Sequence, residues 1–177
     1  MNGELQKLEA RARQFVRAAE SAINYLQSGT LRVLLVEDSA WDVALFRQTL
    51  AKSENLYEVE DVATSQAAMT VIREHRHDLV VLDWHLGSGE HTGLEIVEQM
   101  HAEGVFFPFV VWTGVEADYR EAGRKDCLAW IDKLHVTPSI LNAALILAFK
   151  THFQHQAACD PATNETDPPP AVAQAPI

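Results

Sequence analysis

The chain has 177 residues, of which 47% are hydrophobic and 22% are charged, a composition typical of a folded globular protein. Its formal net charge of −11 argues against nucleic-acid binding, because such a surface needs clustered basic residues. No apolar run approaches the roughly 20 residues of a membrane span, the charged N-terminus lacks the apolar core of a secretory signal, and two cysteines make no disulfide framework. We therefore expect a cytoplasmic protein that binds neither nucleic acid nor membrane.

An N-terminal helix is predicted over residues 4–28, which contain neither Gly nor Pro and are rich in Ala, Glu, Gln and Arg. Apolar residues recur there at alternating steps of three and four, as in a coiled-coil seam. These residues are Leu5, Leu8, Ala12, Phe15, Ala19, Ala22 and Leu26. The helix either packs against its own domain or pairs with its copy in a second chain. The second alternative makes residues 1–30 a dimerisation segment and the protein a homodimer.

Residues 31–156 alternate short apolar runs with stretches of helical periodicity. The predicted strands cover residues 31–36, 57–61, 78–83, 106–112 and 127–131. The predicted helices cover residues 40–51, 65–76, 93–102, 116–125 and a segment that begins at Thr137-Pro138. Five strands alternating with five helices predict an α/β fold, with a doubly wound five-stranded parallel sheet and helices on both faces. The run at 57–61 is the least apolar, so we expect it at an edge.

The last part of the chain, residues 157–177, contains five prolines and few core-forming residues. Such a composition buries too little apolar surface to offset the conformational entropy lost on folding. We therefore predict a flexible tail, and we expect no DNA-binding or catalytic output domain in it.

Polar residues follow the predicted strands at their carboxyl ends, which in a doubly wound sheet meet at one ligand-binding edge. These residues are Glu37, Asp38, Asp83, Thr113 and Lys133. Clustered carboxylates repel one another, and Mg²⁺ relieves the repulsion because it prefers carboxylate and phosphate oxygens. An aspartate can also be the nucleophile that forms an aspartyl phosphate. The pattern predicts Asp83 as the phosphoacceptor, Glu37, Asp38 and Asp83 around Mg²⁺, and Thr113 and Lys133 on the phosphoryl oxygens.

These motifs resemble the receiver domain of bacterial two-component response regulators. The resemblance covers residues 31–150 and rests on LLVEDSAWD, DLVVLDWHL, VVWTG and AWIDK, which occur in the family's order. It implies a flavodoxin-like sheet, Mg²⁺ as cofactor, and a histidine kinase or histidine phosphotransferase that supplies the phosphoryl group to Asp83. It further implies that Trp130 takes the place of the aromatic residue that changes rotamer on activation. His85 lies where a side chain can influence hydrolysis of the phosphoryl group.

Some features depart from the family pattern. Gly87 and Leu134 stand where the family has prolines, and the loop GSGEHTG is longer than the usual turn. We do not predict an enzyme, because an aspartyl-phosphate phosphatase needs a second aspartate at the position of His85. A flavin-binding module needs a Ser/Thr-rich phosphate loop, where this chain has EDSAWD. The remaining alternative is a receiver-like interaction scaffold that is not phosphorylated.

Overall fold

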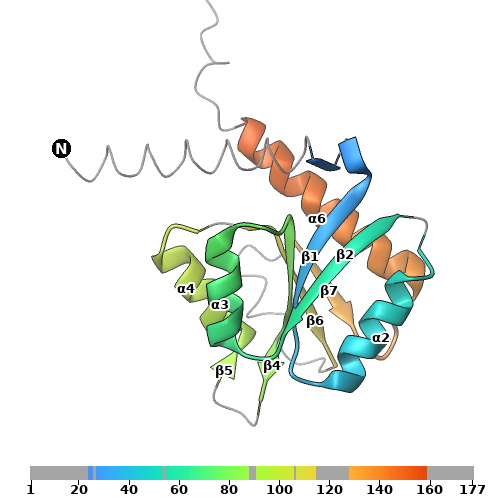
Figure 1. Ribbon diagram of the computed structural model, residues 1–177, viewed down its shortest axis with the longest axis horizontal. Helices are drawn as coiled ribbons and strands as arrows, with labels where there is room; N and C mark the ends of the chain where they lie inside the picture. The colour runs from blue at the N-terminus through green and yellow to red at the C-terminus, as the bar shows by residue number, and fades with distance from the viewer. Residues whose placement is uncertain are drawn as a thin grey trace, which may run out of the picture.

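The computed structural model describes residues 24–25, 27–53, 55–87, 91–105, 107–114 and 128–158. Five parallel strands form one sheet in the order β2-β1-β3-β6-β7. They are β1 (Thr30–Val36), β2 (Leu56–Val62), β3 (Leu79–Asp83), β6 (Phe109–Thr113) and β7 (Ala129–Asp132). This order is the flavodoxin-like form of the doubly wound sheet, which confirms the predicted fold class (Figure 1).

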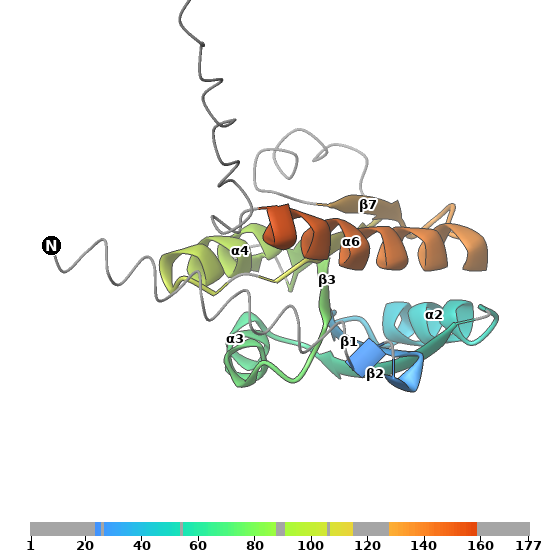
Figure 2. The ribbon, with the colours of Figure 1, turned by 90° about the horizontal axis from the view of Figure 1, so that it is seen from above.

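Helices cover both faces of the sheet (Figure 2). Within the described residues they are α2 (Ala40–Leu50), α3 (Ser65–Glu74), α4 (Gly93–Ala102) and α6 (Pro138–Ala158). Side chains that alternate along the central strands point to opposite faces. Leu34 and Val80 therefore pack with α3 and α4, whereas Val33 and Val81 pack with α2 and α6. Burial on both faces explains why residues 33–36 of β1 and 79–82 of β3 are unbroken apolar runs.

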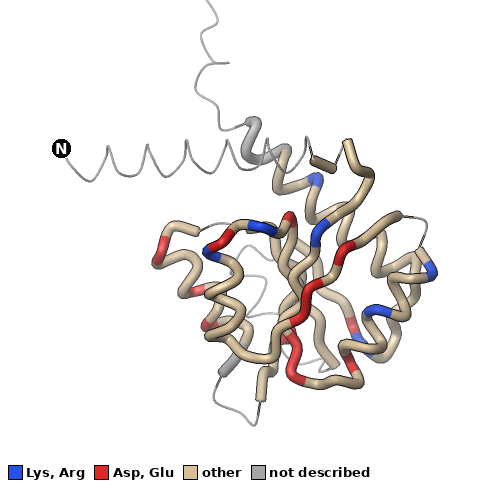
Figure 3. Tube along the Cα trace, in the orientation of Figure 1, with Lys and Arg blue, Asp and Glu red and all other residues tan. Residues whose placement is uncertain are grey.

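Strand β2 lies at one edge of the sheet, as its sequence predicted. Its burial alternates between exposed and half-buried residues, and no residue in it is fully buried. Glu58, Glu60 and Asp61 make it the most acidic strand of the sheet, and Figure 3 shows acidic positions following one another along it. An edge strand needs no second apolar face, which is why polar residues are tolerated here.

The last helix begins at the predicted place. The Thr137 hydroxyl accepts a hydrogen bond from the Ile140 amide at 3.2 Å, and Pro138 is the first helical residue. The chain just before β1 reaches α6, because the ring of Tyr25 makes an edge contact with that of Phe149, with 5.3 Å between the centroids. No helix in the described part of the chain is long and apolar enough to cross a membrane.

Three predicted features lie largely or wholly outside the described residues: most of the helix over 4–28, the helix over 116–125, and nearly all of the tail over 157–177. For residues 24–25 and 27–28, which are described, the backbone is helical.

A small hairpin follows β3, where the sequence predicted only a lengthened loop. Strands β4 (His85–Leu86) and β5 (His91–Thr92) pair antiparallel and lie at the carboxyl end of the main sheet (Figure 1). The hairpin returns the chain to Gly93, whose amide donates to the Trp84 carbonyl at 3.0 Å. A Cβ on Gly93 would lie 2.6 Å from the Asp83 carbonyl oxygen. Helix α4 therefore starts so close to the end of β3 that only glycine fits.

Candidate functional site: the carboxylate pocket

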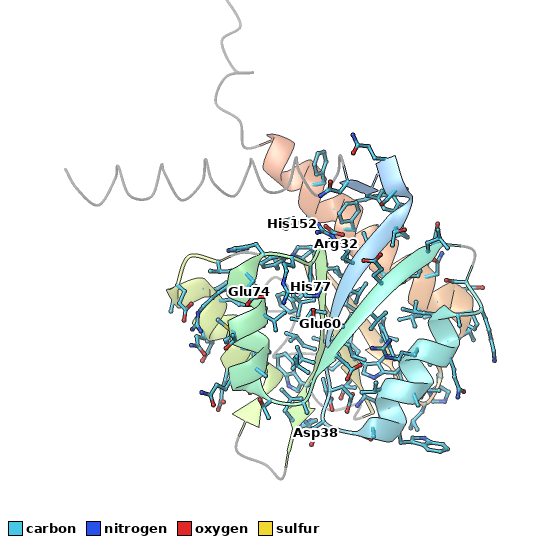
Figure 4. The ribbon with its side chains drawn as sticks, viewed as in Figure 1. Arg32, Asp38, Glu60, Glu74, His77 and His152 are labelled. Atoms are coloured by element: carbon cyan, nitrogen blue, oxygen red, sulfur yellow. The ribbon has the colours of Figure 1, made fainter. Side chains whose placement is uncertain are left out.

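Three carboxylates meet at the carboxyl end of the sheet. Glu37 follows β1 and Asp83 ends β3, and both are buried, with 2% and 5% of their surface exposed. Asp38 is exposed and lies at the lower end of the sheet in Figure 4. One oxygen from each residue lies within 4.8 Å of an oxygen from each of the other two. The structure thus brings together the three residues that the strand-end pattern suggested as a metal site.

Lys133, just after β7, supplies the positive charge of the pocket. Its Nζ lies 2.7 Å from Glu37 Oε2, and it donates hydrogen bonds to Asp83 Oδ2 at 3.0 Å and to Asp42 Oδ2 at 2.9 Å. Burial favours the neutral amine, but the hydrogen bonds and charges of these three carboxylates outweigh that effect and raise the pKa of Lys133. The side chain is therefore a charged ammonium that lies against Asp83.

Glu37 has a raised pKa in the pocket. Burial raises its pKa to about 7, a shift that Lys133 opposes and the negative charge of Asp83 reinforces. Its Oε1 accepts a hydrogen bond from the Ser39 amide at 3.1 Å, and Ser39 is the N-cap of α2. Glu37 is thus fixed by the start of the helix and holds its proton more tightly than an exposed glutamate does.

The start of the hairpin donates to two of the clustered carboxylates. The His85 amide donates to Asp83 Oδ1 at 3.2 Å, and the Gly87 amide donates to Asp38 Oδ2 at 3.0 Å. The His85 side chain is exposed. These backbone bonds fix the orientation of both carboxylates and leave the imidazole of His85 at the surface next to the pocket.

Thr113 and Trp130 come from the neighbouring strands β6 and β7. Asp83 pairs with Trp112 across the sheet, so Thr113 is one residue further toward the carboxyl edge, where it is buried and its carbonyl accepts from the Lys133 amide at 2.9 Å. Trp130 is half-buried and contacts Trp84, with 5.7 Å between the ring centroids. A change of the Trp130 rotamer would therefore disturb the residue directly after Asp83.

Asp42 is a pocket residue that the sequence interpretation missed. It lies in the first turn of α2, four residues after Asp38, and its side chain is 25% exposed. Its partner Lys133 is 91 positions later in the chain, so no local pattern shows the contact. The available signal was its place on a helix that starts at the ligand-binding edge.

The family model of the response regulator receiver domain matches residues 33–136, more than half of the chain. The protein belongs to this family.

Solved structures of receiver domains share the fold. The signal receiver domain of a putative Luxo repressor protein from Vibrio parahaemolyticus is 21% identical, with a TM-score of 0.62, and the match covers 73% of this chain and 97% of that one. The BeF3-activated receiver domain of Klebsiella pneumoniae RstA is 23% identical, with a TM-score of 0.58 and coverages of 67% and 98%. The Mn(2+)-bound form of the response regulator Rcp1 is 23% identical, with a TM-score of 0.52 and coverages of 64% and 88%. None of the curated proteins matches the sequence.

The structure gives a reason for two departures of this receiver domain from the family pattern. Gly87 has a φ of 72°, a left-handed conformation that favours glycine, and its amide donates to Asp38. Proline could supply neither the conformation nor the N–H group. At the second departure, Leu134 is 77% exposed, and its amide donates to Asp132 Oδ1 at 2.8 Å, a bond that proline could not make.

Proposed function

We propose that this receiver domain is the phosphoacceptor of a two-component phosphorelay, and that Asp83 takes a phosphoryl group from a histidine kinase or histidine phosphotransferase. The observation that carries the proposal is the Lys133 ammonium, 3.0 Å from the carboxylate of Asp83 in a pocket of further carboxylates. A carboxylate oxygen of Asp83 attacks phosphorus, the P–O bond forms, and the P–N bond to the donor imidazole breaks. The leaving nitrogen keeps the electron pair and takes up a proton.

The donor set fits Mg²⁺. Glu37, Asp38 and Asp83 offer only oxygen ligands, which this ion prefers, and a cation would relieve the repulsion that contributes to the raised pKa of Glu37. When bound, Mg²⁺ would supply positive charge for the phosphoryl oxygens. Rcp1, which has the same fold, has been solved in a Mn(2+)-bound form, and this supports the proposal that the present domain also binds a divalent cation.

In this proposal, the other pocket residues bind the phosphoryl group or respond to its presence. Lys133 holds one phosphoryl oxygen, and the hydroxyl of Thr113 holds another. Trp130 changes its contact with Trp84 and so alters the surface that partner proteins meet. His85, exposed beside the acceptor, influences hydrolysis. The output is a change in protein contacts rather than catalytic turnover by the domain itself.

Exposed apolar side chains flank the pocket and fit a protein donor. Trp41, next to Asp42, is 80% exposed, and Leu134, next to Lys133, is 77% exposed. Aromatic residues of this kind are enriched in protein interfaces. We place the encounter in the cytoplasm, on the sequence grounds given above.

The test is phosphorylation by a small donor. Wild-type protein incubated with acetyl phosphate and Mg²⁺ should gain one phosphoryl group by intact-mass spectrometry, and Asp83→Asn should gain none while it stays folded. Chelation of Mg²⁺ should abolish the labelling of the wild type. Asp61→Asn, an exposed aspartate on β2, is the matched control and should label normally. An unlabelled wild type would favour the alternative, an interaction scaffold that is not phosphorylated.

We further propose that the protein is a homodimer through residues 4–28. Tyr25, in the described end of this segment, contacts Phe149 of α6. That helix is apolar around much of its circumference: Leu141 and Leu145 are buried against the sheet, whereas Ile140 and Leu147 are 51% and 57% exposed. A helix that is apolar on more than one face usually has more than one partner. The predicted helix over residues 4–28 of the second copy would supply that partner.

A further inference from the structure

Two aspartates share the ammonium of Lys133. Lys133 Nζ donates to Asp83 Oδ2 at 3.0 Å and to Asp42 Oδ2 at 2.9 Å, so the acceptor aspartate and the helix aspartate hold it at nearly the same distance. Asp42 is not among the three clustered carboxylates that could hold a cation. Its contact with Lys133 therefore needs an explanation other than metal binding.

Asp42 is held in place by the start of α2. Its amide donates to the Ser39 side chain at 3.3 Å, and its carboxylate lies in the first turn, where the helix dipole favours negative charge. With one quarter of its side chain exposed, Asp42 is partly shielded from water. Its negative charge is therefore felt by neighbouring groups in the pocket.

A phosphoryl group on Asp83 would change the balance around Lys133. The carboxylate carries one negative charge, whereas a phosphoryl group carries about two, and its oxygens would reach toward the same ammonium. Lys133 would then have to bind the phosphoryl oxygens while it also contacts Asp42 and Glu37. Asp42 would also repel the phosphoryl group, since both are negative and both contact the same nitrogen.

We infer that Asp42 is a positioning residue that competes with the phosphoryl group for Lys133 and thereby limits the stability of phosphorylated Asp83. The inference rests on the proposed function, because it assumes that Asp83 accepts the phosphoryl group. Asp42→Asn keeps a side-chain oxygen that can accept the hydrogen bond but removes the charge. The variant should therefore hold the phosphoryl group more firmly than the wild type does.

The experiment compares affinities for beryllofluoride, a phosphoryl mimic, in the presence of Mg²⁺. We expect Asp42→Asn to bind it about three- to tenfold more tightly, the effect of removing one partly screened charge a few ångströms away. Asp42→Glu should return the affinity toward that of the wild type. The control is Glu103→Gln, which makes the same change in net charge at an exposed ion pair between Arg73 of α3 and the residue just after α4 and should leave the affinity unchanged.

A second readout needs neither metal nor phosphoryl group. The side-chain ammonium signal of Lys133 in an NMR spectrum, assigned with Lys133→Arg, should shift in Asp42→Asn and stay in place in Glu103→Gln. Equal or weaker beryllofluoride binding by Asp42→Asn, in a wild type that does bind the mimic, would overturn the role of Asp42 alone. A wild type that neither binds the mimic nor accepts a phosphoryl group would overturn the proposed function and this inference with it.

Discussion

Asp78, just before β3, forms a buried ion pair with Arg32 of β1. Its side chain is fully buried and accepts from the Arg32 amide at 2.9 Å, from Nε at 3.1 Å and from Nη2 at 2.7 Å. Without the carboxylate, these N–H groups of Arg32 would lose their hydrogen-bond acceptor at a site that is partly shielded from water. We expect Asp78→Ala to lower the free energy of unfolding by about 2–4 kcal/mol, measured by urea denaturation.

A second Arg–Asp pair provides the comparison. Arg47 and Asp61 also form an ion pair, but 46% and 40% of their side chains are exposed. Exposed pairs contribute about 0.2–1 kcal/mol because water screens them, so Asp61→Ala should cost much less than Asp78→Ala. Equal losses would mean that burial does not set the strength of the Arg32–Asp78 pair.

His77 makes the stability of the fold depend on pH. Burial lowers its pKa, and the charges of Arg76 and Arg32 act in the same direction, whereas Glu60, 3.1 Å from Nε2, opposes them. Figure 4 shows Arg32, Glu60 and His77 grouped well away from Asp38. With a depressed pKa in the folded state, His77 contributes stability that is present above about pH 6.5 and is lost as the pH falls below it.

His77→Gln should therefore lose less stability than the wild type between about pH 7.5 and about pH 5.5. Urea midpoints at the two pH values measure the difference. A parallel loss in wild type and His77→Gln would assign the pH dependence to other groups.

At the scale of the elements, the backbones of the hairpin and α4 come close together at Gly93. A methyl group at position 93 would meet the Asp83 carbonyl at 2.6 Å, and the backbone would have to shift. We expect Gly93→Ala to destabilise the protein by about 1–3 kcal/mol. Gly114→Ala should change stability by less than about 0.5 kcal/mol, because no atom of the described residues lies within 4 Å of the added carbon. Differential scanning calorimetry distinguishes the two.

The main sheet could be predicted because its strands have strong local signals. Residues 33–36 and 79–82 are apolar runs, as a sheet buried on both faces requires, and the mixed run at 57–61 predicted the edge position of β2. The hairpin could not be predicted, since strands of two residues show no periodicity. Its formation depends on backbone contacts such as the bond between Gly87 and Asp38.

The pocket was predictable to the extent that the topology gathers strand ends. Glu37, Asp83 and Lys133 each follow or end a strand, so the order of the strands brings them to one edge. Asp42 instead enters the pocket from helix α2, and its contact with Lys133 joins residues that lie 91 positions apart in the chain. The sequence contains no comparable pattern for side chains that reach a site from the helices beside the sheet.

At the scale of the whole molecule, the proposed dimer predicts what truncation does. Deleting residues 1–22 removes most of the apolar seam but keeps Tyr25 and its contact with Phe149. We expect the full chain to be a dimer by light scattering and the truncated chain to be a monomer with an intact fold. Leu147→Gln, which makes an exposed position of α6 polar, should weaken the dimer without unfolding the domain. A dimer unaffected by either change would place the interface elsewhere.

The acidic edge strand also bears on aggregation. An unpaired strand edge is a template on which another chain can add a strand, and proteins commonly protect it with charge. Of the seven residues of β2, three are acidic, so a second copy docking there would bring rows of like charge into register. Lateral growth into a continuous intermolecular sheet is thereby disfavoured at this edge. Acid protonates these carboxylates and high salt screens them, so either condition suppresses their repulsion. We therefore expect the protein to resist fibril formation less well in acid or at high salt.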